Sequence, residues 1–268
     1  MVIKPGTHIL KVRYWVKDIV TNVEGIITKT LSQETYDSNT YYDMTANLNV
    51  RNYDGDHYYM WDAQQQYWYG YEWTKNLPVG VGQPTLLGQS SGNYPQSNAD
   101  SRWHNTSFSG YSVSTPATHT PCKDLPNVNE MTWYAAKGDP RWDGDELWTT
   151  MGHLYKGGMW FKKKSQISGF NANTAYDGTD WRTTSKNYSG SVSLTPPSAA
   201  DAGNYFYLPA LGFYFSGQLY NVGDNGYYWS SSASPWSSNN AYDLTFSNGV
   251  VSVDNGSCGN GIRVGGFE

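Results

Sequence analysis

The sequence predicts a mostly β fold with minor α content, and three features of its 268 residues point to this class. Aromatic residues make up 16% of the chain and charged residues only 15%, a balance that favours strands and structured loops over helices. Several segments alternate apolar and polar residues, as half-buried strands do. Runs of Gly, Ser and Asn separate these segments and are typical of turns.

The first fifty residues are predicted to be strands of a β-sandwich module, residues 1–50. Residues 7–17, 19–31 and 41–50 alternate in polarity, with turn-like composition between them. Three strands alone are marginally stable, so either an upstream part completes the sandwich or these strands pack on the rest of the chain. Residues 1–20 carry charges throughout and form neither a signal-peptide core nor a membrane span.

Residues 51–119 are irregular, and we interpret them as a connector that ends in the first strands of a second domain, residues 120–268. In that domain Asn127 followed by Glu130 has capping-box spacing, which predicts a helix ending at Gly138. A second short helix is predicted near residues 145–148, because acidic residues there suit a helix N-terminus. Residues 157–161 have the composition of a buried strand.

From Asn204 onward, short apolar segments recur at turn spacing and predict an antiparallel meander. The predicted strands are residues 205–208, 212–215, 226–231, 241–246, 250–253 and 261–264. Ser247-Asn248-Gly249 is a hairpin signal, since Asn-Gly accepts the positive φ angles that a tight turn needs. The second domain is therefore expected to be an α+β domain with few helices.

Aromatic and glycine motifs recur along residues 120–268. They are Trp133-Tyr134, Gly138-Asp139-Pro140, Trp142 to Trp148, Gly157-Gly158-Met159-Trp160, Leu208-Pro209-Ala210, Gly226 to Ser231 and Gly261-Ile262-Arg263-Val264. In combination they resemble bacterial C-type-lectin-fold proteins, more narrowly the Bacteroides-type surface proteins and the retroelement-diversified variable proteins that share this fold with the formylglycine-generating-enzyme superfamily. The first fifty residues are similar, by strand pattern alone, to the last strands of fimbrillin-like or immunoglobulin-like modules. The resemblance implies a C-type-lectin-like ligand-binding domain on a β-sandwich stalk.

The resemblance also implies where a ligand binds, because diversified members vary a C-terminal repeat by mutating template adenines. Residues 254–260 are all reachable from an Asn codon by changing adenines alone, although Asp, Asn, Gly and Ser are also simply what loops contain. The candidate ligand-binding residues are Ser234, Trp236, Ser237, Ser238, Asn239, Asn240, Tyr242, Asp243, Asn248, Asp254, Asn255, Ser257 and Asn260. Trp236, flanked by Ser and Pro, is expected on an exposed turn as the main contact, whereas Trp229 is expected in the core.

No catalytic, metal or cofactor site is predicted. Formylglycine generation uses a pair of nearby cysteines as copper ligands, and only Cys258 lies in the region where the resemblance places them. The acidic stretch 139–146 lacks the EF-hand pattern and is better explained by loop and helix-cap positions. The five histidines lack zinc spacing. Cys122 and Cys258 could pair in an oxidising compartment, which their spacing alone does not decide.

We therefore expect a non-enzymatic, surface-displayed binding protein, an adhesin or receptor-binding tip, that recognises a cell-surface glycan or protein through its C-terminal face. It would work at the extracellular or outer-membrane surface. The net charge of −5 without a long basic run argues against nucleic acid as a partner. One alternative is a structural fimbrial tip or stalk subunit with pilus partners, which an incomplete N-terminal sheet would favour. Others are a phage-tail tip, which trimerisation would favour, and a formylglycine-generating-type oxidase.

Overall fold

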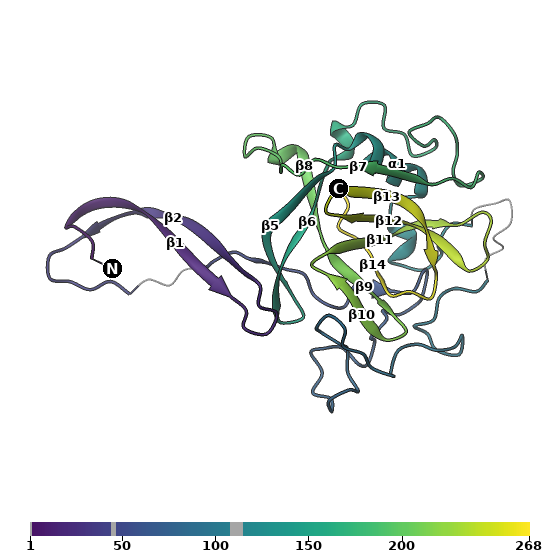
Figure 1. Cartoon of the computed structure of the whole chain (residues 1–268), viewed down its shortest axis with the longest axis horizontal. Coiled ribbons are helices and arrows are strands. Elements are labelled where there is room, and N and C mark those ends of the chain that lie inside the picture. Colours follow the sequence, from purple (N-terminus) through teal and green to yellow (C-terminus); the bar gives the residue numbers. More distant parts are fainter. Residues whose placement is uncertain (1, 44–46, 108–114) are drawn as a thin grey trace.

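Strands dominate the computed structural model, which describes residues 2–43, 47–107 and 115–268. Strands account for 39% of residues and helices for 7%, so the predicted mostly β class with minor α is confirmed. Figure 1 shows a long two-stranded arm that extends from a body of sheets, a helix and irregular segments. The C-terminus lies in the body, far from the arm.

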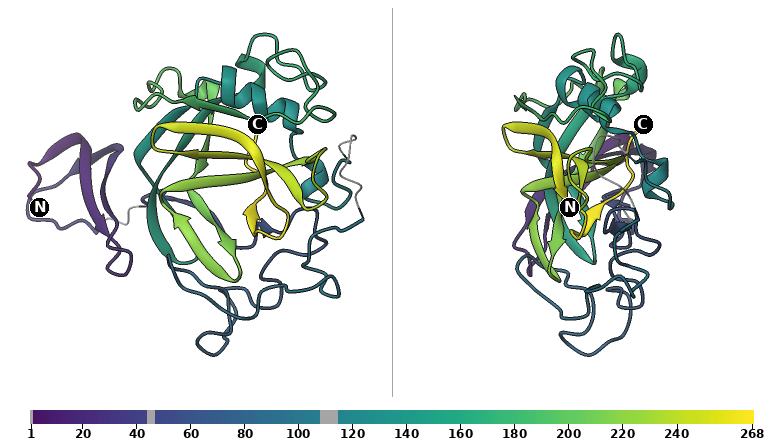
Figure 2. Two further views of the ribbon diagram at one scale, coloured as in Figure 1. Left: turned by 45° about the vertical axis from the view of Figure 1, so that its right-hand side comes forward. Right: turned by 90° about the vertical axis from the view of Figure 1, so that its right-hand side faces the viewer.

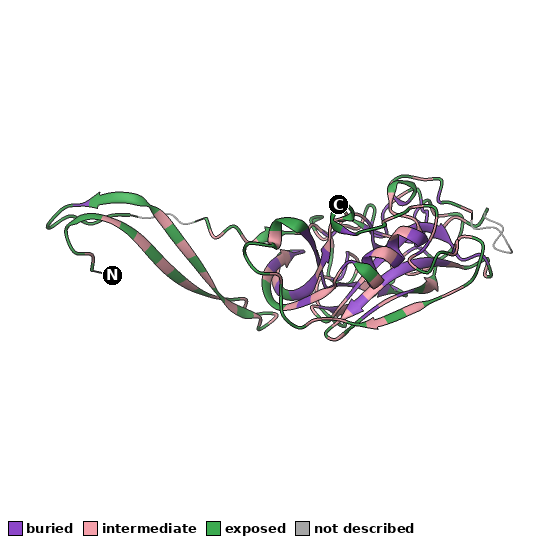
Figure 3. Ribbon diagram, turned by 90° about the horizontal axis from the view of Figure 1, so that it is seen from above, coloured by how far each residue is buried: buried purple, intermediate pink, exposed green. Residues whose placement is uncertain are grey.

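The arm is an antiparallel hairpin of β1 (Gly6–Lys17) and β2 (Glu24–Tyr36). Exposed and half-buried residues alternate along most of both strands, as the sequence pattern predicted (Figure 3). The two strands form a sheet of their own and pair with no other strand of the described chain. An N-terminal β structure is thus present as a two-stranded ribbon.

The third strand predicted at residues 41–50 is wrong for the described positions. Residues 41–43 and 47–50 are outside any strand, and residues 44–46 lie outside the part of the chain that is described. The chain turns back instead, because the Tyr42 hydroxyl accepts a hydrogen bond from the Asp37 amide and its ring meets Tyr36 edge-on at 5.0 Å. This local packing takes the place of strand pairing.

The base of the arm is fixed to the body by its turn. Asp18 accepts a hydrogen bond from the Leu154 amide at 2.9 Å and lies 3.3 Å from the His153 ring, while Thr21 donates to the Leu154 carbonyl. Burial acts to raise the pKa of Asp18, but the amides of Leu154, Val20 and Thr21 outweigh it and hold that pKa at about 2. The carboxylate is therefore charged at any physiological pH and ties the arm to the body.

Within the described residues, the body contains two sheets. One has the strand order β3-β5-β6-β8, and the other follows the path β10-β9-β11-β12-β13-β7, with β14 joining β11 and β4. The strand bounds are β3 Arg51–Asn52, β4 Tyr58–Tyr59, β5 Arg141–Thr150, β6 His153–Lys162, β7 Tyr188–Ser191, β8 Tyr205–Pro209, β9 Leu211–Phe215, β10 Gln218–Val222, β11 Asn225–Ala233, β12 Asn240–Ser247, β13 Val250–Ser257 and β14 Ile262–Arg263. All six strands predicted after Asn204 are present, and β12 and β13 meet at the predicted Asn248-Gly249 turn. The expected antiparallel meander is wrong, because β11 pairs in parallel with β9 and β14 and β8 belongs to the other sheet.

The helix α1 (Val128–Lys137) begins with the predicted capping box. The Asn127 side chain accepts from the Glu130 amide at 3.2 Å, and the Glu130 carboxylate accepts from the Asn127 amide at 2.9 Å. Short 3-10 turns are η1 Cys122–Asp124, η2 Lys164–Gln166 and η3 Ala202–Asn204. No helix among the described residues is long and apolar enough to cross a membrane.

The second helix predicted near residues 145–148 is wrong, because these residues belong to β5. The strand register shifts between Asp143 and Leu147, and the Asp143 carboxylate accepts hydrogen bonds from the amides of Asp145 and Glu146. The acidic residues therefore sit in an exposed bulge instead of a helix N-terminus. Trp148, which follows the bulge, is fully buried and holds this stretch in the sheet.

Aromatic side chains fill three adjoining hydrophobic clusters. The first packs α1 against β6, β8, β12 and β13, and the second gathers tyrosines and tryptophans such as Trp68, Trp148 and Tyr214. The third surrounds Trp61 and Trp229. Residues 51–107 run around one side of the body in irregular conformation (Figure 2), yet they contribute several of these buried rings.

Candidate functional site

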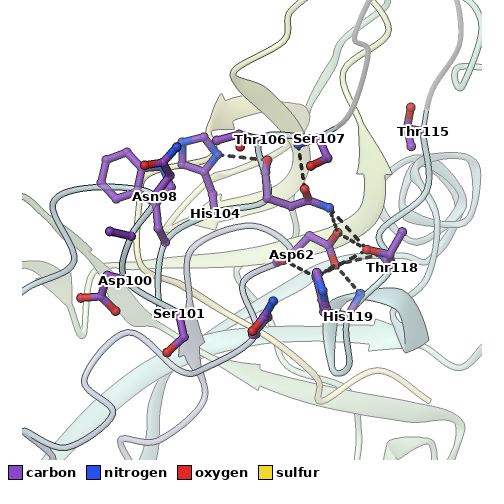
Figure 4. Close-up of a pocket in the computed structure, with 14 residues that line it drawn as sticks. Asp62, Asn98, Asp100, Ser101, His104, Thr106, Ser107, Thr115, Thr118 and His119 are labelled. Atoms are coloured by element: carbon purple, nitrogen blue, oxygen red, sulfur yellow. Dashed lines mark hydrogen bonds and ion pairs between the residues drawn. The ribbon is translucent and has the colours of Figure 1, made fainter.

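A polar pocket of about 680 Å³ opens where loop segments around residues 62–64, 98–107 and 115–119 meet (Figure 4). This volume lies within the range of small-ligand sites. Its walls carry carboxylate, amide, hydroxyl and imidazole groups, with Trp103 as the aromatic member. The segments come from the irregular part of the chain, which the strands of the body hold in place.

Asp62 organises one wall of the pocket. It is buried and adopts a φ of 54°, an uncommon conformation that Asp tolerates better than most residues. Its carboxylate accepts hydrogen bonds from the amide and hydroxyl of Thr118 at 2.9 and 3.0 Å, from the His119 amide at 2.6 Å and from the Asn105 side chain at 2.7 Å. These bonds fix two loops relative to one another.

Arg102 holds the 98–107 segment of the pocket in place without lining the pocket itself. Its buried guanidinium binds both oxygens of Asp100 and donates to the carbonyls of Tyr67 and Asn93. This guanidinium lowers the pKa of Asp100, so the carboxylate at the pocket is charged at neutral pH. The guanidinium also lies 5.2 Å from the centre of the Tyr71 ring. Such a set of bonds holds the 98–107 loop in one conformation.

Several side chains at the pocket are available to a ligand. Within the described part of the chain, Gln64, Asn98 and Ser101 make no side-chain hydrogen bond. The Trp103 ring is half-buried and lies 5.0 Å from the His104 ring. Burial lowers the pKa of His104, which keeps the imidazole neutral at pH 7. The pocket thus offers amide and hydroxyl groups beside an aromatic ring.

The pocket lies next to the loop that the sequence singled out. The Ala117 amide donates to the Ser231 carbonyl, and the Ala233 amide donates to the Thr115 carbonyl, which joins the pocket wall to the end of β11. The β11–β12 loop, residues 234–239, starts directly after this point. Its Trp236 is 52% exposed, as predicted for a turn residue.

The predicted ligand-binding residues fall into an exposed and a buried group. Trp236, Ser237, Ser238, Asn239, Asn240, Asn248, Asp254, Asn255, Ser257 and Asn260 are exposed or half-buried, whereas Ser234, Tyr242 and Asp243 are buried. Tyr242 points inward on β12 and its hydroxyl donates to the Lys186 carbonyl. The prediction is therefore wrong for Ser234, Tyr242 and Asp243, which lie in the interior and cannot contact a ligand directly. Trp229 is fully buried, as expected for a core residue.

Most of the exposed candidate residues lie close together at one end of β12, but Asn248 does not. The Asn240 side chain donates to Asn255 at 2.7 Å, and the Asn255 side chain donates to the neighbouring Asp254. The Cys258 amide donates to the Asn239 carbonyl, which brings the loop after β13 against the β11–β12 loop. Asn248 lies at the other end of β12, about 25 Å away along the strand.

No family model matches this chain. Neither the curated proteins nor the solved structures give a match to it, so the likeness to C-type-lectin-fold proteins stays a prediction. Among the described residues, no three His, Cys, Asp or Glu side chains are grouped to hold a metal ion. In the acidic stretch 139–146, Asp139 binds Arg141 and Tyr205, which gives it a structural partner.

The residues of the pocket were missed by reasoning from the sequence alone, which treated residues 51–119 as a connector. One signal lay in the Trp103-His104-Asn105 cluster among Ser, Asn and Asp, which has the composition of a binding loop. That signal did not identify the pocket, because its walls come from segments separated in sequence. Asn105 and Thr118 meet only in the folded chain, where both bind the Asp62 carboxylate and the Asn105 side chain donates to the Thr118 hydroxyl.

Proposed function

We propose that this chain is a surface-displayed binding protein, an adhesin or receptor-binding tip, that takes a glycan in the polar pocket and against the adjoining β11–β12 loop. The observation that carries the proposal is the pocket itself, with unpaired amide and hydroxyl side chains at Gln64, Asn98 and Ser101 beside Trp103. Fixed loops form its walls. Binding would therefore require little reordering of the protein.

The chemistry of this surface suits a sugar. A sugar ring presents hydroxyl groups around its edge and C–H groups on its faces, so it needs both hydrogen-bonding side chains and a flat apolar partner. The pocket supplies the first and Trp103 the second. Trp236 adds a rigid aromatic contact outside the pocket, where Ser237 and Ser238 supply adaptable polar groups.

The C-terminal face forms part of this binding site, and the function is binding without bond chemistry. Support comes from the exposed positions on the β11–β12 loop and on the loop after β13, which are held to each other through Asn239 and Cys258. A C-type-lectin-like domain whose exposed loops vary over a constant sheet would use this face. If the sequence of these loops varies between copies of the gene, different variants could bind different ligands.

The test begins with the full chain on a printed glycan array, followed by calorimetry with the strongest glycan. Asn98→Ala and Gln64→Ala should each weaken binding about 5- to 10-fold, because each removes about one hydrogen bond to the ligand and none within the protein. Trp236→Ala should weaken it about 10-fold or more. Melting temperatures should change by no more than about 2 °C.

Val79→Ala is the matched control, since Val79 is fully exposed and does not line the pocket. If no glycan on the array binds, the glycan proposal is wrong and a protein ligand is the remaining candidate. Glycan binding that survives all three site variants would place the binding site elsewhere on the molecule.

A second candidate, a fimbrial tip or stalk subunit, is favoured by one observation. The arm of β1 and β2 is a two-stranded sheet whose outer edges are unpaired in the described chain. Sheets of this kind accept an added strand from a partner. Such a subunit would bind a pilus protein through the arm, whereas the pocket lies on the body.

A further inference from the structure

Both cysteines of the chain lie in the same hydrophobic cluster. Cys122 and Cys258 are fully buried there with Trp61, Trp229 and Ala233, although they are far apart in the sequence. Both thiols are free in this structure. Cys122 begins η1, and Cys258 follows the last residue of β13, so each belongs to a segment at the candidate site.

Two successive backbone amides donate hydrogen bonds to the two cysteines. The Trp61 amide donates to the Cys258 carbonyl at 2.9 Å, and the next amide, that of Asp62, donates to the Cys122 sulfur at 3.3 Å. The backbone of Trp61 and Asp62 therefore contacts both cysteines, Cys258 through its carbonyl and Cys122 through its sulfur. Burial raises the pKa of Cys258 well above its usual value, and the charge of a Cys122 thiolate would act in the same direction.

We propose that Cys122 and Cys258 form a disulfide when the protein folds in an oxidising compartment. The bond would tie the loop after β13 to η1 and, through Asp62, to the wall of the polar pocket. It would fix the position of Asp254, Asn255 and Ser257 relative to the pocket. The proposal does not depend on the identity of any ligand.

The reaction is thiol–disulfide exchange with a small-molecule disulfide such as oxidised glutathione. One cysteine thiolate attacks the disulfide and releases one glutathione thiol, and the second cysteine then attacks the mixed disulfide and releases the other. Two protein thiols are oxidised and one glutathione disulfide is reduced to two thiols. Burial raises the pKa of Cys122 to about 12, so thiolate is scarce in the folded chain and the bond should form mainly during folding.

The test refolds the full chain from denaturant with a mixture of oxidised and reduced glutathione. Mass spectrometry of an unreduced digest should show the peptides of Cys122 and Cys258 linked, and thiol titration in denaturant should find no free thiol. The oxidised chain should melt about 5–15 °C above the reduced chain, because the cross-link restricts a long loop in the unfolded state. Amides of residues 254–260 should exchange hydrogen more slowly than in the reduced chain.

The double variant Cys122→Ala with Cys258→Ala is the control, since its melting temperature should not respond to reductant. The same oxidant added to the folded, reduced chain should act far more slowly than during refolding. Two free thiols and no linked peptides after oxidative refolding would overturn the proposal without any variant. Cross-links between chains only would overturn it as well.

Discussion

At the scale of single residues, Asp243 combines a carboxyl group with a buried position on β12. Burial raises its pKa to about 8, and the facing Asp254 on β13 adds to this, while a hydrogen bond from Thr245 acts in the opposite direction. Trp229 on β11 lies opposite Asp243 in the strand register, and the charge of Asp243 helps to raise the pKa of Tyr227 two positions along. Asp243 is therefore protonated in the folded chain at neutral pH, which explains how a carboxyl group can occupy this interior site.

This raised pKa predicts a loss of stability as the pH rises. Between about pH 4 and pH 8 the folded chain keeps the proton that the unfolded chain releases, so the contribution of Asp243 to stability falls across this range. Asp243→Asn keeps the shape without the charge. It should raise the melting temperature by about 5 °C or more at pH 8 and change it little at pH 4.

Calorimetry of the variant and the parent chain at both pH values measures this difference. Asp145→Asn serves as the control, because the Asp145 side chain is fully exposed in the bulge of β5 and belongs to the other sheet. An equal shift at pH 4 and pH 8 would show that Asp243→Asn acts through packing and not through the proton.

At the scale of elements, the arm of β1 and β2 exposes large apolar side chains to solvent. Ile9, Trp15 and Ile26 are more than half exposed on one of its faces, and the opposite face is only half-buried. Isolated hairpins are marginally stable in water. Lys11 and Arg13 lie on the same exposed face of β1 as Trp15, so a strand that pairs with β1 would fit best with acidic side chains on that face.

The fimbrial alternative therefore predicts that the arm accepts a strand. A synthetic peptide of about ten residues that alternates Val and Glu should slow hydrogen exchange at the outer edge of β1 in the full chain. A peptide of the same composition with a central Pro should not, because Pro cannot complete the ladder of hydrogen bonds. Exchange rates unchanged by either peptide would contradict strand acceptance, and a stable trimer without peptide would favour the phage-tail alternative.

Local signals predicted the elements whose structure depends on neighbouring residues. Asn127 and Glu130 specify a helix start within four positions, and the Asn248-Gly249 turn specifies a hairpin. Tertiary packing decided the rest. Residues 145–148 have helix-start composition but form part of a strand, because burial of the Trp148 side chain holds them in the sheet. Trp61 is positioned by hydrogen bonds to residues far along the chain, Ser230 and Cys258. The pocket also depends on tertiary packing, so its residues could not be found from local sequence patterns.

At the scale of the whole molecule, the C-terminal region separates a buried interior from an exposed edge. Ala241, Leu244 and Phe246 on β12 are fully buried, whereas Ser238 and Asn239 just before this strand are exposed. Substitutions at exposed loop positions usually change stability by less than about 0.5 kcal/mol. A diversified binding protein needs this separation, because its loops must vary while its core does not.

The diversification hypothesis predicts a matching pattern in the gene. Deep sequencing of about the last fifty codons with the flanking DNA should reveal a nearby imperfect copy that differs only at adenines. Codons for exposed residues such as Ser238, Asn239 and Asp254 should vary, while those for Leu244 and Phe246 should stay constant, since large changes there would create cavities or overpacking. A constant 3′ end without such a copy would contradict diversification. The same pocket and loops would then be those of an adhesin or pilus subunit with one invariant partner.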